Sequence, residues 1–204
     1  NLELCKHMLA ERKDSLVHYV VNHNLFLSEI ADCDDVYLKI ENSIALEPVH
    51  LGTTYSIEAI INPSVHQEAY ASLIGNHPGY TYYEGFVIQH DADKQNVYTF
   101  GFGNGRKWLP GATFTIEPEK WTYLAITVDK DKITVYLDGR KVTSVNAQDV
   151  IKNSAMPLYV FDWIEQNRPF HGLIKEVRIS NSTLSPEVIA NNWENDSYAK
   201  ILAY

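Results

Sequence analysis

Cysteine and long apolar runs are scarce in this chain of 204 residues. Its two cysteines, Cys5 and Cys33, can form one disulfide or remain two free thiols, and their spacing fits neither a disulfide-dense scaffold nor a zinc site. The longest apolar stretch, Leu16 to Leu27, is interrupted by histidines and asparagines and is shorter than the roughly 20 apolar residues that a membrane-spanning helix needs. We therefore expect no membrane insertion, and a fold that is stabilised by its hydrophobic core.

Basic residues are also few, since 17 lysines and arginines stand against 26 aspartates and glutamates, for a net charge of −9. No basic residue lies between Glu41 and Asp93, a stretch that carries seven carboxylates. Nucleic acids, anionic lipids and strongly sulfated glycans are bound largely through cations. The charge distribution therefore argues against all three as partners.

Short runs of alternating character, rich in aromatic residues, follow one another along most of the chain. They are Val36–Ile40, Tyr55–Ile61, Tyr82–His90, Val97–Phe102, Trp121–Val128, Ile133–Leu137, Leu158–Trp163 and Leu173–Ser180. Turn residues separate them, as at Asp91–Asn96 and at Asp138-Gly139, and Asp-Gly between two alternating runs is a strong hairpin signal. Strands at this spacing, without long helices between them, predict an all-β antiparallel sandwich.

Two segments have helical character instead. Apolar residues in Leu2–Arg12 fall at helical spacing, which suits an N-terminal helix or linker. Near the other end, Ser185-Pro186-Glu187 has the form of a helix start with proline at the first helical position, leading into Val188–Trp193. We expect one short helix at each end of the sandwich.

Four segments stand in an order that is typical of one family: YSIEAIINPS (55–64), KWTYLAITVDKDKITVYLDGRKV (120–142), PLYVF (157–161) and FHGLIKEVRISNSTLSPEVI (170–189). In this order they resemble the laminin G-like branch of the concanavalin A-like lectin and glucanase superfamily. The resemblance covers about residues 35–193 and implies a jelly roll of two antiparallel sheets. It divides the chain into an N-terminal helical segment or linker with a first edge strand (1–34), the jelly roll (35–193) and a tail (194–204).

The resemblance also bears on calcium and on compartment. Related jelly rolls often use an aspartate to hold a structural calcium where this chain has Lys175. Because calcium takes oxygen ligands and an ammonium group cannot be one, we expect no cofactor and no calcium at that position. The chain starts at Asn1 without a signal peptide, so we expect a processed protein or a piece of a longer one. Its compartment stays unknown, with the resemblance slightly favouring an extracellular or cell-surface location.

The segment from Gly75 to Gly85 is the first candidate binding loop. Sugars are bound by stacking on aromatic rings while amides and carboxylates take their hydroxyl groups. This loop supplies both kinds of group, in Asn76, His77, Tyr80, Tyr82, Tyr83 and Glu84. The alternative is that its tyrosines fill the core of the sandwich.

Two further candidates come later in the chain. The segment before the last predicted strand offers Asp162, Trp163, Gln166, Asn167 and Arg168, with Trp163 as a stacking ring. It faintly resembles the acidic calcium loop of pentraxins over three residues, and it is alternatively a solvated connection with one buried tryptophan. Trp108, beside Arg106, either contacts a ligand or packs over an open sheet edge.

Catalysis finds little support in the sequence. Retaining glucanases of the superfamily carry E-x-D-x-(x)-E, which places two carboxyl groups roughly 5 Å apart. The nearest match, from Val160 to Glu165, has valine where the first glutamate belongs, and the eight histidines lack metal-ligand spacing. We therefore expect a non-catalytic module that binds a neutral or weakly charged carbohydrate and is part of a larger protein, with a protein partner or a flanking catalytic domain as its further partner. The alternatives are a protein–protein adhesion or scaffolding domain and a glycan-active enzyme.

Overall fold

The structure is a computed structural model that describes residues 51–78, 82–147, 149–156, 158–160 and 168–195, together with the backbone of three short strands before residue 50. Its strands are β1 (Phe26–Ser28), β2 (Tyr37–Lys39), β3 (Ile44–Leu46), β4 (Thr54–Pro63), β5 (Ser72–Gly75), β6 (Phe86–His90), β7 (Val97–Gly103), β8 (Trp108–Thr115), β9 (Thr122–Asp129), β10 (Lys132–Leu137), β11 (Arg140–Asn146), β12 (Leu158–Val160) and β13 (Gly172–Ser180). One helix follows, α3 (Pro186–Asn195). Among the described residues, no helix has both the length and the apolar character to cross a bilayer.

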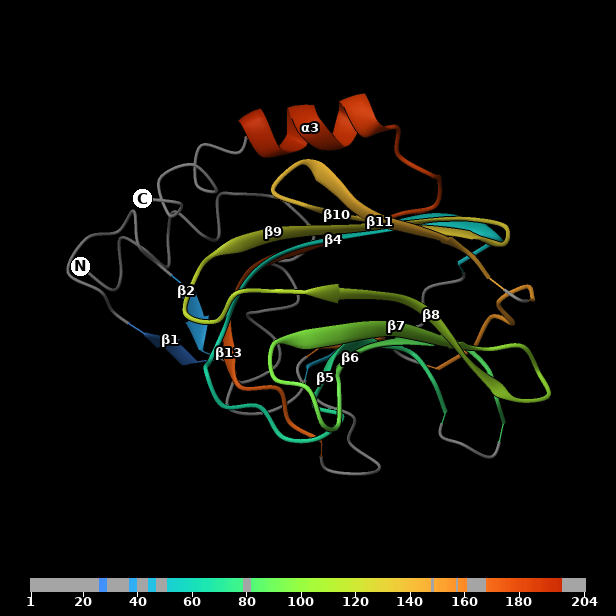
Figure 1. Ribbon diagram of the computed structural model, residues 1–204, viewed down its shortest axis with the longest axis horizontal. Helices are drawn as coiled ribbons and strands as arrows, with labels where there is room; N and C mark the ends of the chain where they lie inside the picture. The colour runs from blue at the N-terminus through green and yellow to red at the C-terminus, as the bar shows by residue number, and fades with distance from the viewer. Residues whose placement is uncertain are drawn as a thin grey trace.

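The strands form two sheets that lie face to face, with α3 on the outside of one of them (Figure 1). The seven-stranded sheet has the order β1-β2-β13-β4-β9-β10-β11, and the six-stranded sheet has the order β3-β12-β5-β6-β7-β8. Neighbouring strands are antiparallel, as in β4 with β9 and β6 with β7. The predicted antiparallel sandwich and its C-terminal helix are confirmed. The predicted helix at Leu2–Arg12 and both cysteines lie outside the described residues, and the predicted domain boundaries stay a prediction.

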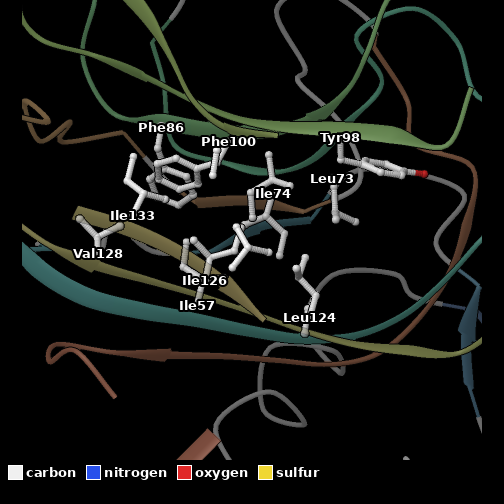
Figure 2. Close-up of a cluster of buried hydrophobic side chains, with 14 of the residues drawn as sticks. Ile57, Leu73, Ile74, Phe86, Tyr98, Phe100, Leu124, Ile126, Val128 and Ile133 are labelled. Carbon is white, nitrogen blue, oxygen red and sulfur yellow. The ribbon is translucent and has the colours of Figure 1, made fainter. Parts of the chain in front are cut away.

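The core lies between the sheets and is built from alternate residues of the inner strands. Figure 2 shows Ile57, Leu124, Ile126 and Val128 of the seven-stranded sheet facing Phe86, Phe100 and Ile74 of the six-stranded sheet. The rings of Phe86 and Phe100 stack at 5.4 Å. Since burying each such side chain contributes about 1.5–3 kcal/mol, this layer holds the two sheets together.

Helix α3 covers the outer face of the seven-stranded sheet. Ile189 is buried there among Ile60, Tyr123 and Tyr136. The Ser185 hydroxyl accepts a hydrogen bond from the Val188 amide at 3.3 Å, as expected of a helix cap. The predicted start of the helix is therefore confirmed, and so is the prediction that β9 is covered on both of its faces.

A buried carboxylate joins α3 to the sheet. Glu58 of β4, 3% exposed, accepts hydrogen bonds from the Tyr123 hydroxyl at 2.5 Å and the Asn192 amide at 2.8 Å, and Arg178 lies 3.8 Å away. Burial, together with the Glu58 carboxylate, raises the pKa of Tyr123 far above its usual range, so its phenol stays protonated and donates. We name Glu58, Tyr123, Asn192 and Arg178 the helix network, because it fixes α3 in place.

Four strands lie where the sequence did not predict them. β3 and β5 are short, β8 contains Pro110 and Gly111, and β11 is largely polar. Both β8 and β11 are edge strands, where proline and exposed polar side chains are tolerated. One predicted strand is shorter than expected: the run from Tyr82 becomes a strand only at Phe86, because Tyr83 and Gly85 turn the chain with φ of 51° and 75°.

Candidate functional site

Three loops meet at one end of the six-stranded sheet, where β5 and β7 end and β6 and β8 begin. They comprise residues 82–85, 103–107 and 149–152, and we call them the three-loop rim. Four backbone hydrogen bonds join them. The Gly85 amide donates to the Lys152 carbonyl at 2.6 Å, and the Lys152 amide donates to the Gly103 carbonyl at 2.8 Å. The Gly103 amide donates to the Gly85 carbonyl at 3.0 Å, and the Gly105 amide donates to the Tyr83 carbonyl at 2.7 Å. The loops therefore brace one another through their main chains.

Glycine at position 103 makes this packing possible. A Cβ atom there would lie 2.0 Å from both the carbonyl carbon and the carbonyl oxygen of Tyr83, so the first loop rests directly on the backbone of β7. Gly101, two residues earlier on the same face, has no such neighbour, and its nearest atom would lie 3.7 Å away. The position of the first loop thus depends on one residue that lacks a side chain.

Polar side chains complete the rim. The side-chain oxygen of Asn104 accepts from the amides of Arg106 and Lys107 at 2.9 and 2.8 Å, and its Nδ2 donates to Asp149 at 2.9 Å. Lys152 Nζ lies 2.9 Å from Glu84 Oε1. Hydrogen bonds from the Val150 amide and from Asn104, with the charges of Arg106 and Lys107, lower the pKa of the exposed Asp149 carboxyl, which keeps it ionised.

Of the predicted residues in the first binding loop that the structure describes, Tyr82 is the most exposed. Its side chain is 63% exposed, so it does not fill the core, whereas Tyr83 and Glu84 are half-buried. Asn76 is buried, and its side-chain oxygen accepts from the Phe86 amide at 3.0 Å. The structure thus assigns Asn76 to holding the loop and leaves Tyr82 facing solvent.

His77 and Trp108 meet beneath the rim. Their rings are in edge contact at 5.0 Å, with Trp108 half-buried at the start of β8. Burial and, secondly, the positive charge of Arg168 lower the pKa of His77 to about 4, so this ring is neutral at neutral pH. The Trp108 indole N–H is buried and has no hydrogen-bond partner among the described residues. This pair supports the loops from below, in keeping with the packing alternative for Trp108.

The backbone of Arg168 lies away from the rim. Its carbonyl accepts from the Ser72 amide at 2.9 Å, at the end of β5 opposite the rim, and its guanidinium lies 4.9 Å from the centre of the Tyr70 ring. The structure therefore brings together Asn76, His77, Tyr82, Tyr83, Glu84 and Trp108, and it separates the backbone of Arg168 from them. The other candidates, Tyr80, Asp162, Trp163, Gln166 and Asn167, lie outside the described residues.

Metal binding is a separate question. In the part of the chain that the structure describes, no three His, Cys, Asp or Glu residues are arranged to hold a metal ion. The side chain of Lys175 lies outside that part, so the expectation of no calcium at this position stays a prediction.

Sequence reasoning missed two members of the rim, Asp149 and Lys152. Each contacts a residue that is distant in sequence, since Asp149 binds Asn104 and Lys152 pairs with Glu84. No local pattern marks such pairs. The sequence did indicate the loop that Asp149 contacts, through Trp108 and the neighbouring Arg106.

Two stacked antiparallel sheets with exposed loops at one end define an antiparallel β-sandwich. The family model described as "Concanavalin A-like lectin/glucanases superfamily", of laminin G type, matches residues 37–190, so the chain belongs to this family. A search of curated proteins gives no match.

Solved structures with this fold come from several sources. Domain 4 of AbnA, an extracellular GH43 arabinanase from Geobacillus stearothermophilus solved with arabinotriose, is 20% identical with a TM-score of 0.64, covering 83% of this chain and 81% of that one. The binding domain of botulinum neurotoxin serotype D is 17% identical, with a TM-score of 0.64 and coverage of 85% and 45%. A candidate carbohydrate-binding protein from Bacteroides ovatus is 18% identical, with a TM-score of 0.56 and coverage of 74% and 44%. The chain thus spans less than half the length of the last two, and these likenesses establish the fold.

Proposed function

We propose that this domain is a non-catalytic carbohydrate-binding module whose ligand stacks on Tyr82 at the three-loop rim. The observation that carries the proposal is the 63% exposed ring of Tyr82 on a loop braced by main-chain hydrogen bonds to two others. A large aromatic side chain held in solvent on a fixed loop offers stacking area at little cost in ordering. The module is expected to belong to a larger protein.

The similar structures support the same class of ligand. The arabinanase domain was solved with arabinotriose, and the Bacteroides ovatus protein is named for carbohydrate binding. A glycosidase instead needs two carboxyl groups facing one substrate, roughly 5 to 9.5 Å apart. Here Glu58 is turned toward α3, Glu84 pairs with Lys152, and Asp149 binds Asn104. The described carboxylates near the rim and on β4 therefore serve the structure, which favours binding over hydrolysis.

A glycan array on three forms of the protein tests the proposal, each form with calcium and with EDTA. They are the unchanged chain, Tyr82→Ala, and Tyr70→Ala as a matched control, since Tyr70 is an exposed tyrosine at the opposite end of β5. We expect glycan binding in both buffers, retained in Tyr70→Ala and weakened about tenfold or more in Tyr82→Ala.

Folding must be unchanged for that comparison to hold. Because the Tyr82 side chain makes few buried contacts, Tyr82→Ala is expected to change the unfolding free energy by no more than about 0.5 kcal/mol. A blank array in both buffers contradicts glycan binding and points to a protein partner. Equal binding by Tyr82→Ala contradicts the assignment of the rim.

A further inference from the structure

We infer that the glycan bound at the three-loop rim carries a carboxylate, as sialic and uronic acids do, and that Arg106 and Lys107 receive it. This inference rests on the proposed function and narrows its ligand class. It is based on the hydrogen bonds and ion pairs of the rim, which most of its polar side chains form and two of its cations do not.

Most polar side chains of the rim are already occupied. Both oxygens of Asp149 accept hydrogen bonds, from Val150 and Asn104, and Asn104 uses both its oxygen and its nitrogen within the rim. Glu84 and Lys152 pair with each other, so the charge of Lys152 is already balanced.

Arg106 and Lys107 are the exceptions. Both side chains are exposed, and neither forms a side-chain hydrogen bond or an ion pair with any residue that the structure describes, although their charges act on the neighbouring Asp149 carboxylate. Their backbone, in contrast, is fixed, because Asn104 holds both of their amides. Guanidinium and ammonium groups only donate, and the guanidinium matches a carboxylate with two parallel hydrogen bonds.

The backbones of the two loops meet next to the stacking ring. The Gly105 amide donates to the Tyr83 carbonyl at 2.7 Å, and Gly105 precedes Arg106 while Tyr83 follows Tyr82. A sugar stacked on Tyr82 is therefore expected to lie within reach of the exposed side chains of Arg106 and Lys107. A single carboxylate per sugar also agrees with the acidic character of the whole chain, which disfavours dense sulfation.

Paired ligands that differ only in charge test the inference by titration. The probes are sialyllactose against its carboxyl methyl ester, and tri-galacturonate against its methyl ester, so that sialic and uronic acids are distinguished. We expect at least one acidic probe to bind about tenfold more tightly than its neutral partner, with affinity that falls as salt rises. In Arg106→Ala/Lys107→Ala this preference is expected to disappear while the neutral probe keeps its affinity.

Lys94→Ala/Lys120→Ala is the charge-matched control, since it removes two exposed lysines from loops that follow β6 and β8, at the opposite end of the six-stranded sheet. This control is expected to keep the preference for the acid. Equal affinity for acidic and neutral probes overturns the inference and leaves the proposed function standing. Loss of preference in the control overturns the assignment to Arg106 and Lys107, and absence of binding by every probe and every array glycan overturns both proposals.

Discussion

Two polar regions of this protein, the helix network and the three-loop rim, contain the same kinds of side chain but differ in what these side chains do. In the helix network, Glu58 is buried between the seven-stranded sheet and α3, and its hydrogen bonds come from Tyr123 and Asn192. At the three-loop rim, Glu84 and Lys152 pair at the surface and the neighbouring Tyr82 ring faces solvent. The first region fixes a helix, and the second leaves an aromatic ring exposed at the surface.

The comparison shows why a glutamate on a strand is a poor guide to function by itself. Glu58 lies on β4 in the middle of a sheet, yet α3 covers it. The rim has an exposed ring and two exposed cations without an ion pair to a described residue. Covering by α3, rather than residue type, separates the two regions.

The largest effect is expected from Glu58→Ala. Removing the carboxylate leaves the Tyr123 hydroxyl and the Asn192 amide without this acceptor and takes one opposite charge away from Arg178. We expect a loss of about 3 to 4 kcal/mol in unfolding free energy. Urea denaturation measures it, with Glu194→Ala, an exposed carboxylate of the same helix, as the control expected to change little. Equal stability of the two variants would show that the helix network does not hold α3.

A pH dependence is expected from His77, which lies beneath the rim. Its pKa is about 4 in the folded protein against 6.5 for a free histidine, so the unfolded chain binds the extra proton between these values. Its stabilisation is therefore complete above pH 6.5 and falls toward pH 4, by at most about 3 kcal/mol.

Comparison with His77→Gln isolates this contribution from other titrating groups. Urea denaturation at several pH values is expected to show the unchanged chain losing more stability than the variant as the pH falls from 6.5 to 4. Parallel pH profiles for the two proteins would refute the buried, neutral state of His77.

Gly103→Ala is expected to lower the stability less than Glu58→Ala does, and it is also expected to weaken glycan binding. The new Cβ meets the Tyr83 carbonyl, so the first loop must move away from β7. We expect about 1–3 kcal/mol of destabilisation and at least about a tenfold loss of glycan affinity, measured by denaturation and titration. Gly101→Ala is the matched control, because its Cβ finds only ordinary contacts. If both variants bind glycan equally well, the position of the first loop does not matter for binding.

The fold was predictable because its signals are local. The alternation in Trp121–Val128 predicted a strand covered on both faces, and Ser185-Pro186 predicted the start of α3. The Asp138-Gly139 turn was equally clear, since both residues take the positive φ, 50° and 73°, that a two-residue hairpin requires. Each of these features depends on residues that are neighbours in the chain.

The site was predictable only in part, because its assembly depends on distant contacts. The sequence identified Tyr82 and Trp108 as candidate rings, but burial decided that one faces solvent and the other packs beneath the loops. It also proposed Asn76 as a partner for sugar hydroxyls, whereas the structure commits its side-chain oxygen to the Phe86 amide. Whether a polar group is free for a ligand depends on such pairings, and spacing along the chain does not reveal them.

The most direct test of the central claim is a map of backbone amide chemical shifts by NMR, recorded while a glycan selected from the array is added. The account predicts that the amides with changed chemical shifts cluster in residues 82–85, 103–107 and 149–152. The amide chemical shifts of α3 and β4 are expected to stay unchanged. Perturbations centred on α3, or at the Tyr70 and Arg168 end of β5, would contradict it and place the ligand elsewhere on the sandwich.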